Sequence, residues 1–495
     1  MFQYRYNFTN FDQYSFFMQT KTSGKELLYL KIAKNIEQQI NNDVLKVGDK
    51  LPSIRMVCRQ QGVSMSTAQF AYYELEAKSL IESRPQSGYY VSNSFRKRLP
   101  MPAISRPESK GTIKTVTDIF DNAFNNPDEK NFTLFSRGVP AASLLPIAKL
   151  KKGITQAMKS LPGGGTLYEP VQGNEKLRTQ VARWSFSWKG SLANKEILTT
   201  SGCISAVSYC LMALTKRGDT IAVESPCFYG ILQLAQSLGL KVLELPTNPQ
   251  TGVEMESLKK IVQQTKLAAC LLVSNFNNPF GSLMPDEHKR EAVKLLSKYN
   301  VPLIEDDIYG DICFDDKRPT CCKTYDENGM VLLCGSVSKT LAPGYRVGWV
   351  APGKYMEQVM KLKLFHSLYS PSITHEVIGS FLENGRYEAH LRKLRRTLHA
   401  NYLQYVRIIG EYFPEGTKIS RPQGGLSLWV ELPKKTDTLE LYNTAFNRKI
   451  SFSPGSMFTL KKQFSNCMRL SYGLEWNEKT ENGLKLLGKL AKEML

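Results

Sequence analysis

The sequence predicts an α/β chain with two folds in succession: a small helical module that ends in a β-hairpin, and a large, mostly parallel sheet covered by helices. Three observations lead to this prediction. The 495 residues exceed what one hydrophobic core normally holds. Residues 24–92 show helical spacing and then two short strands. After Pro140, amphipathic stretches of helix length alternate with short apolar strands, and a small C-terminal α+β subdomain is expected to follow.

Composition narrows the class of protein. A net charge of +20 favours contact with polyanions without locating the contact. The longest apolar runs have strand length, so no membrane-spanning segment is expected. The N-terminus lacks the apolar core of a signal peptide, so a cytoplasmic protein is predicted. Ten cysteines without a C-x-x-C pair indicate neither a metal site nor a disulfide framework.

The predicted organisation has four parts. Pro and charged residues without sustained periodicity, such as Leu99-Pro100-Met101-Pro102, are typical of a linker. The stretch before the module gives no indication of its purpose. The predicted parts are an N-terminal extension at residues 1–23, the module at 24–92, the linker at 93–135 and the large domain at 136–495.

Residues 24–92 predict three helices and a hairpin. Apolar residues from Leu28 to Ile40 recur at mostly helical spacing and predict the first helix. Ser53 and Ser64 stand where they can cap a second and a third helix, with a short turn at Gly62 between them. Two short strands then flank Pro85-Gln86-Ser87-Gly88. These elements together make a winged helix-turn-helix.

This module resembles the GntR type of bacterial transcription regulator through VGDKLPSIR, GVSMSTAQFAYYELEAKSLI and SGYYV. The resemblance implies binding to double-stranded operator DNA, with the third helix at the bases and the wing glycine near the minor groove. Met65 stands where relatives often carry arginine. The residues that the resemblance assigns to DNA are Ser53, Arg55, Ser64, Ser66, Thr67, Gln69 and Gly88.

The stretch from Ser336 to Trp349, SVSKTLAPGYRVGW, concentrates the chemistry of the large domain. Lys339 lies among small and hydroxylated residues, with Arg346 close behind. A lysine that bonds an aldehyde must lose its proton, which partial burial and a neighbouring cation favour. An arginine offers two N–H donors to a phosphate. The stretch predicts an aldehyde cofactor on Lys339 and a phosphate on Arg346; the alternative is a solvated surface lysine and arginine.

Further polar residues follow predicted strands, where ligands of parallel sheets bind. The backbone after Gly202 opens a helix and can hold an anion. Asp306 suits a pyridine nitrogen, which an adjacent carboxylate keeps protonated. Tyr309 and Asn278 can hold the phenolate oxygen of the same ring, and Phe228 can stack on its face. The ordered set therefore predicts a pyridine-ring cofactor.

The set resembles the class I aminotransferase family of fold type I over essentially all of residues 136–495. The resemblance implies pyridoxal 5′-phosphate (PLP) bonded to Lys339 as the catalytic lysine, and a substrate carboxylate bound by Arg469. It also implies that Tyr168 reaches the phosphate of a partner subunit. Phe228 stands where tyrosine is more usual. The cofactor-binding residues that it implies are Gly202, Cys203, Ile204, Phe228, Asn278, Asp306, Tyr309, Ser336, Lys339, Arg346 and Tyr168.

The two parts in this order resemble the MocR/GabR group of bacterial regulators. That resemblance implies a head-to-tail homodimer in which an amino acid or related amine, reacting at the cofactor, changes DNA binding. The alternative is an active aminotransferase whose N-terminal module serves assembly or autoregulation. Both alternatives need the same lysine, so the sequence leaves both open.

Overall fold

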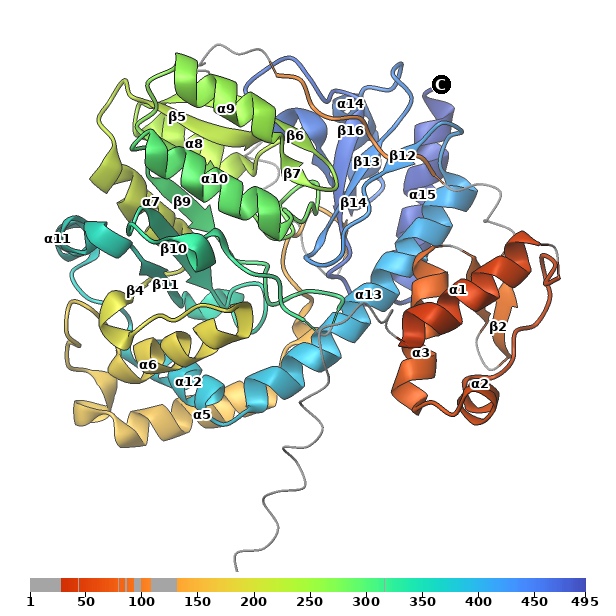
Figure 1. The fold of residues 1–495 in the computed structure, drawn as a ribbon, viewed down its shortest axis with the longest axis horizontal. Helices are drawn as coiled ribbons and strands as arrows, with labels where there is room; N and C mark the ends of the chain where they lie inside the picture. Colours follow the sequence, from red (N-terminus) through yellow and green to blue (C-terminus); the bar gives the residue numbers. More distant parts are fainter. Residues whose placement is uncertain are drawn as a thin grey trace, which may run out of the picture. The chain divides into compact units, whose positions relative to one another are not determined.

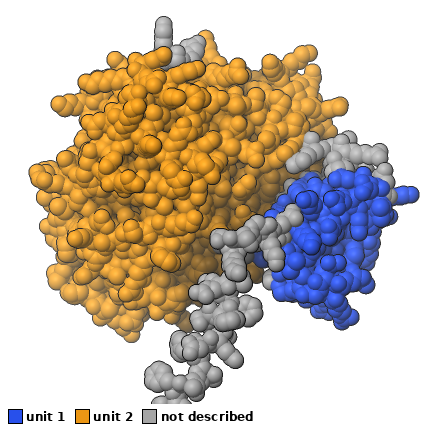
Figure 2. All heavy atoms as spheres, viewed as in Figure 1, with its two compact units in different colours: residues 1–98 blue, residues 99–495 orange. Residues whose placement is uncertain are grey.

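The chain divides into two compact units, residues 1–98 and 99–495 (Figure 2). The predicted extension at residues 1–23, and residues 93–98 and 108–130 of the predicted linker, lie outside the described residues. No helix in the described part is long and apolar enough to cross a membrane. The computed structural model describes residues 28–42, 44–78, 80–84, 87–92, 99–107, 131–315 and 317–495.

The first unit is the predicted winged helix-turn-helix (Figure 1). The hydroxyl of Ser53 accepts a hydrogen bond from the Met56 N–H at 3.2 Å, and that of Ser64 accepts from the Thr67 N–H at 3.1 Å, so each serine caps a helix. Gly62 ends the second helix with φ 62°. The elements are α1 (Leu28–Asn41), α2 (Ile54–Gln61), α3 (Met65–Ala77) and the antiparallel hairpin of β1 (Ile81–Arg84) and β2 (Gly88–Val91).

One sheet of eight strands organises the second unit. Its order is β4-β11-β10-β9-β8-β5-β6-β7, and the strands from β10 to β6 are all parallel. The strand β11 is antiparallel to both of its neighbours, and β7 is antiparallel to β6. The strands are β4 (Leu198–Thr200), β5 (Thr220–Ser225), β6 (Lys241–Asn248), β7 (Gly252–Val253), β8 (Ala269–Leu272), β9 (Leu303–Asp306), β10 (Val331–Ser336) and β11 (Gly348–Ala351).

Helices cover both faces of this sheet, as predicted (Figure 1). Alternate residues of β5 show the division: Ile221 and Val223 pack in one buried cluster with α7 and α8, and Ala222 packs in another with α9 and α10. A strand that is buried on both faces is expected to consist mainly of consecutive apolar residues. The centre of β5 has such a run. The helices are α7 (Cys203–Leu214), α8 (Tyr229–Ser237), α9 (Met255–Gln264), α10 (Asp286–Lys298) and α11 (Met356–Ser367), of which α11 joins the cluster of α7 and α8.

A second, antiparallel sheet forms the small C-terminal subdomain, in the order β12-β13-β16-β15. The 27-residue helix α13 (Arg386–Tyr412) connects the subdomains. Tyr387 and Leu391 lie in the cluster of α5, α6 and α12, and Leu398 and Tyr405 pack with the second sheet. The other elements are β12 (Lys418–Ile419), β13 (Ser427–Glu431), β15 (Ser453–Pro454), β16 (Cys467–Ser471), α5 (Ile147–Ser160), α6 (Glu175–Ser185), α12 (Ser372–Glu383), α14 (Thr438–Asn447) and α15 (Glu478–Glu493).

Part of the predicted linker lies in the second unit and hydrogen-bonds to strands of both sheets. The N–H of Ile419 in β12 donates to the Pro100 carbonyl at 3.0 Å. The N–H of Ser105 donates to the carbonyl of Thr247 in β6 at 3.1 Å, and the Thr247 N–H donates back to the Ser105 hydroxyl at 2.9 Å. Nearer the end of the linker, β3 (Thr133–Leu134) pairs in parallel with β14 (Ile450–Ser451).

Candidate functional site

Two neighbouring parallel strands place the central residues of the candidate site. Asp306 ends β9 and lies in register with Cys334 of β10, while Lys339 follows the end of β10 by three residues. The hydroxyl of Ser336 donates to the Val347 carbonyl at 2.7 Å and accepts from the Ser338 N–H at 3.0 Å. These bonds hold the turn after β10, so Ser336 fixes the loop that carries Lys339.

Lys339 is a partly buried amine beside a second cation. Its Nζ donates to the Gly138 carbonyl at 2.7 Å and lies 6.0 Å from the centre of the Tyr309 ring. A Cβ on Gly138 would lie 3.0 Å from Nη1 of Arg469 and 4.0 Å from Nζ of Lys339, so the two cations converge on this glycine. Burial first, and then the Arg469 charge, lower the pKa of Lys339 to about 8. A larger fraction of Lys339 is therefore an uncharged nucleophile at neutral pH than for an ordinary lysine.

Asp306 receives a hydrogen bond that the sequence did not predict. The thiol of Cys203, the first residue of α7, lies 3.2 Å from Oδ1 of Asp306 and donates to it. Burial raises the pKa of Asp306 to about 6, and the Cys203 contact partly offsets that rise. The backbone of Ile308 also hydrogen-bonds to Asp306, and a carboxylate whose pKa is still raised can share a proton with a nearby base. From the sequence, only the backbone of Cys203 was predicted to take part in the site. The identity of a residue as cysteine does not indicate which way its side chain points.

The start of α7 and Arg346 form a corner at the predicted phosphate site, called here the anion-binding corner after that prediction. Nη2 of Arg346 donates to the Ser201 carbonyl at 3.1 Å, and Nη1 lies 3.5 Å from the Ser338 hydroxyl. A Cβ on Gly202, whose φ is 96°, would lie 2.3 Å from Nη2 of Arg346. The first N–H groups of a helix carry partial positive charge, so a guanidinium beside them suits an anion. Ile204, in the first turn of α7, is exposed.

Tyr309 and Asn278 are adjacent, as their predicted shared role requires. Nδ2 of Asn278 lies 3.4 Å from the Tyr309 hydroxyl, and Oδ1 lies 3.4 Å from the Ser427 hydroxyl. Burial raises the pKa of Tyr309, so its hydroxyl stays protonated and remains a donor. Phe228 precedes α8, and its ring packs 4.6 Å from that of Tyr229.

Arg469 of β16 is buried with an incomplete set of partners. Its Nη2 donates to the Ser136 carbonyl and, at 2.6 Å, to the Ser453 hydroxyl. Its Nε has no hydrogen-bond partner among the described residues. Burial lowers the pKa of Arg469, and the nearby Tyr229 partly offsets this. Tyr229 was not predicted as a site residue, because Phe228 beside it took the aromatic role.

Among the described residues, Tyr168 does not contact the other candidate site residues of the same chain. Its side chain is 79% exposed, and its ring stacks on Tyr369 with centres 4.5 Å apart. Leu167 beside it is 61% exposed. A role for Tyr168 at a cofactor therefore requires a second copy of the chain.

In the first unit, the candidate DNA contacts divide into two groups. Ser53 and Ser64 use their hydroxyls as helix caps, and the Thr67 hydroxyl lies 2.8 Å from that of Ser64. Gln69 donates from Nε2 to the Tyr73 hydroxyl at 2.7 Å. Arg55 on α2 and Gly88 at the start of β2 are exposed, and the side chain of Ser66 lies outside the described residues.

Two cations that the sequence did not single out lie at the hairpin: Arg84 at the end of β1, and Lys50, which bridges to Tyr90 of β2. Cζ of Arg84 lies 4.2 Å from the centre of the Tyr90 ring, and Nζ of Lys50 lies 5.8 Å from it. A Cβ on Gly88 would lie 3.6 Å from Lys50. Cations beside an exposed glycine suit contact with a phosphate backbone. Lys50 and Gly88 come together only in the folded module. Their spacing along the chain therefore could not predict this contact.

Comparison with known proteins covers both units. The family of aminotransferase class I and II matches residues 135–483, and the bacterial regulatory proteins of the gntR family match residues 28–91. The uncharacterized HTH-type transcriptional regulator YjiR of Escherichia coli is 35% identical over 93% of this chain and 98% of its own length. The HTH-type transcriptional regulator NorG of Staphylococcus aureus is 26% identical over 88% of this chain and 98% of its own.

Solved structures share the fold of the second unit. LysN, an alpha-aminoadipate aminotransferase from Thermus thermophilus complexed with N-(5′-phosphopyridoxyl)-L-leucine, superposes with a TM-score of 0.69. It is 24% identical and covers 74% of this chain and 93% of its own. An archaeal alanine:glyoxylate aminotransferase gives a TM-score of 0.71 at 24% identity, covering 78% of this chain and 96% of its own.

Proposed function

Because this chain belongs to the aminotransferase class I and II family and carries a gntR-family module before that domain, we propose that it is a transcription regulator that senses an amino acid or related amine through bound PLP. This order of domains is the MocR-type architecture. One observation carries the proposal: a single chain holds a winged helix-turn-helix and, in its second unit, Lys339, Asp306 and Arg346 around one sheet edge. Relatives that match both units are named transcriptional regulators.

The residues present fit PLP. The corner of Arg346 and the α7 start offers cationic and N–H donors to a phosphate, and a side chain at position 202 would fill it. Lys339 offers an amine with a lowered pKa, and Asp306 offers a buried carboxylate with a raised pKa. Tyr309 and Asn278 would hold the ring oxygen, and Phe228 the ring face. Two serine hydroxyls would have different roles near the phosphate. That of Ser338 lies next to Arg346, and that of Ser336 stabilises the loop through its hydrogen bond to the Val347 carbonyl.

When bound, PLP supplies an aldehyde that exchanges amines and a ring that withdraws electrons. Asp306 would keep the ring nitrogen protonated, and its raised pKa favours such proton sharing. Lys339 would supply the amine for exchange with an effector amine. Arg469 would bind the effector's carboxylate, because its Nη1 lies beside Gly138, next to the Lys339 amine.

A way to couple the effector to DNA follows from the segment of residues 136–138. Arg469 donates to the Ser136 carbonyl, and Lys339 donates to the Gly138 carbonyl. An effector that engages Lys339 and Arg469 would take hydrogen bonds away from the carbonyls of Ser136 and Gly138. A ligand shifts a conformational equilibrium when it binds one conformation more tightly than the other. Ser136 directly follows the predicted linker, whose end, β3, pairs with β14, so the change occurs next to that end of the linker.

The proposal is tested by mobility-shift titrations with the promoter of the protein's own gene at fixed salt, with and without a panel of amino acids and amines. Lys339→Ala should keep its DNA affinity and lose its response to the effector, because the amine that is exchanged is gone. Arg55→Ala should lose most of its DNA affinity and keep the visible absorption band of bound PLP. Fixed salt is essential, since phosphate contacts make affinity salt-dependent.

Arg59→Ala is the matched control for Arg55→Ala, because both arginines are exposed on α2. It should bind DNA nearly as wild type does. If the wild type does not prefer its promoter to random DNA under any of these conditions, the regulator proposal fails. Rapid conversion of the bound cofactor to its amine form by amino acids would then identify the protein as an aminotransferase.

A further inference from the structure

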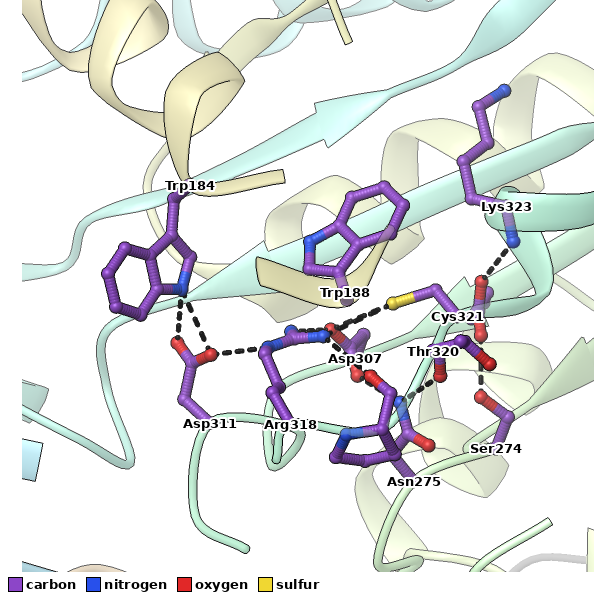
Figure 3. A network of polar contacts seen from close by, with 12 residues as sticks. Trp184, Trp188, Ser274, Asn275, Asp307, Asp311, Arg318, Thr320, Cys321 and Lys323 are labelled. Carbon is purple, nitrogen blue, oxygen red and sulfur yellow. Dashed lines mark hydrogen bonds and ion pairs between the residues drawn. The ribbon is translucent and has the colours of Figure 1, made fainter. Parts of the chain in front are cut away.

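Figure 3 shows a group of buried charged side chains that includes Asp307 and Asp311, which follow the end of β9. Arg318 is at its centre: Nη2 contacts a carboxylate oxygen of Asp307, and Nε donates to Oδ1 of Asp311 at 2.5 Å. Their side chains are only 6%, 5% and 13% exposed, in the order Arg318, Asp307, Asp311. Trp184 also donates to Asp311, at 3.0 Å. Such charges are stable inside a protein only when paired, so these contacts fix one another.

The group continues to the loop that carries Lys339. Tyr387, near the start of α13, donates to Oδ2 of Asp311 at 2.8 Å, and the same hydroxyl oxygen lies 2.9 Å from Oγ1 of Thr340. Nε2 of His390, one turn further along α13, lies 2.7 Å from the Thr340 carbonyl. Thr340 is therefore held through both its side chain and its backbone.

Two residues of this group are neighbours, in the sequence, of residues of the proposed site. Asp307 directly follows Asp306, and Thr340 directly follows Lys339. Asp311 remains charged: burial by itself raises its pKa, but Arg318 and its hydrogen-bond donors outweigh burial and lower it. The carboxylate therefore keeps its contacts at neutral pH, and the end of β9 stays linked to the Lys339 loop by more than the pairing of β9 with β10.

We propose that Arg318, Asp311 and Tyr387 are positioning residues that hold the Lys339 amine where it can bond the cofactor aldehyde; this inference rests on the proposed function. In that reaction the Lys339 nitrogen adds to the aldehyde carbon, and the aldehyde oxygen leaves as water with two protons from the amine. The phosphate is held separately, by Arg346 and α7. Loss of positioning therefore slows the formation of the bond and leaves the capture of PLP intact.

Tyr387→Phe tests this inference because it removes one hydroxyl and nothing else. Cofactor-free protein is mixed with increasing PLP, and the visible band is followed in a stopped-flow instrument. The maximal rate of bond formation should fall roughly ten- to hundredfold, as expected when a reacting group is misplaced. The PLP concentration that gives half of that rate should not change. Tyr405→Phe is the matched control: Tyr405 is also buried on α13, but its hydroxyl donates to the Ser471 carbonyl at 2.9 Å, in the second sheet.

Thr340→Val removes the contact between the Tyr387 and Thr340 hydroxyls by changing Thr340 instead of Tyr387. It serves as the test of the positioning role if Tyr387→Phe does not fold. The double variant should be no slower than the slower single variant, because both remove one interaction. If Tyr387→Phe and Thr340→Val react as fast as Tyr405→Phe, the positioning role is wrong and the cofactor assignment stands. Parallel loss of PLP capture and of thermal stability would indicate a structural role and also overturn it. A wild type that binds no PLP overturns both the inference and the proposed function.

Discussion

At the scale of single residues, Arg469 is the most constrained group of the proposed effector site. It is 1% exposed, and its guanidinium donates to Ser136 and Ser453 but leaves Nε without a partner among the described residues. A buried donor without a partner costs about 1–3 kcal/mol. Nη1 of Arg469 is the guanidinium nitrogen that lies beside Gly138 and Lys339, so we expect carboxylated amines to bind better than simple amines.

Arg469→Ala should weaken binding of amino acids by roughly 2–4 kcal/mol, since it removes a charge-assisted partner of the carboxylate in a buried site. Matched amines without the carboxylate should bind nearly as they do to wild type. Bound PLP should remain, because its phosphate contacts lie at Arg346. Titration of the cofactor spectrum with both ligand classes measures this, and equal losses for the two classes would mean that Arg469 serves the fold instead.

The residues with distinctive chemistry were predictable from the sequence, and their detailed contacts were not. Lys339, Asp306 and Arg346 stand out because few structural roles need a lysine, a carboxylate and an arginine after strand-like segments. The direction of the Cys203 thiol toward Asp306 depends on how α7 packs on β9. Likewise Ser336 and Ser338 are two residues apart, and only the turn after β10 decides which hydroxyl lies beside Arg346.

At the scale of elements, the contact between α7 and Arg346 decides the shape of the anion-binding corner. Gly202 precedes α7 with φ 96°, and the guanidinium lies where a Cβ would project. Gly348 of β11 is equally restricted, since its Cβ would lie 2.6 Å from the Gly202 carbonyl carbon. Two glycines from distant parts of the chain thus let a helix start, a strand and an arginine meet.

Gly202→Ala should lower PLP affinity by roughly 1.5–3 kcal/mol, the worth of a hydrogen bond to a charged group, because the methyl displaces Arg346. Gly218→Ala is the control: its φ is 91°, which strains alanine similarly, but no atom lies within 4 Å of its Cβ. Both variants should lose about 1–2 kcal/mol of stability from backbone strain. Equilibrium PLP titration and thermal melts separate the two effects; equal PLP affinities would contradict the contact.

Element prediction succeeded for the apolar strands of the large sheet, and it failed for β7 and β11. The apolar segments at 197–198, 220–223, 241–245, 268–274, 303–304 and 331–334 all overlap strands of this sheet. The four residues of β11 include a glycine and follow the Arg346 motif directly, so no periodicity marks them. This strand exists because β4 and β10 pair with it on either side, and β4 is about 150 residues away in the sequence. Such long-range pairing leaves no local signal.

At the scale of the whole molecule, four large apolar side chains on two segments of the second unit are exposed. Leu167, Tyr168, Phe365 and Leu368 are 61%, 79%, 77% and 53% exposed. The stacking of Tyr168 on Tyr369 joins the two segments that carry these residues. Contiguous exposed apolar groups of this kind mark association sites. We propose that a second copy of the chain covers them, which would also bring Tyr168 to its partner's cofactor.

The wild type should therefore sediment as a dimer, and Leu167→Glu should weaken the dimer by roughly 1.5–3 kcal/mol or more, the worth of one buried leucine. Because Tyr168 would then leave the partner's site, PLP affinity should fall at concentrations where the variant is monomeric. Leu439→Glu, at a leucine that is 37% exposed on α14, should stay dimeric. A monomeric wild type with full PLP affinity would contradict this interface.

The helix α13 has a mechanical consequence beyond its packing (Figure 1). At 1.5 Å per residue, its 27 residues make a rod of about 40 Å. One end is held by Tyr387 and His390 at the Lys339 loop, and the other lies against the second sheet. A tilt of only about 3° at the first end displaces the other by about 2 Å, since the rod is about 40 Å long. A rigid helix of this length links the Lys339 loop to the second sheet, and the shift that goes with such a small tilt is as large as known allosteric helix shifts.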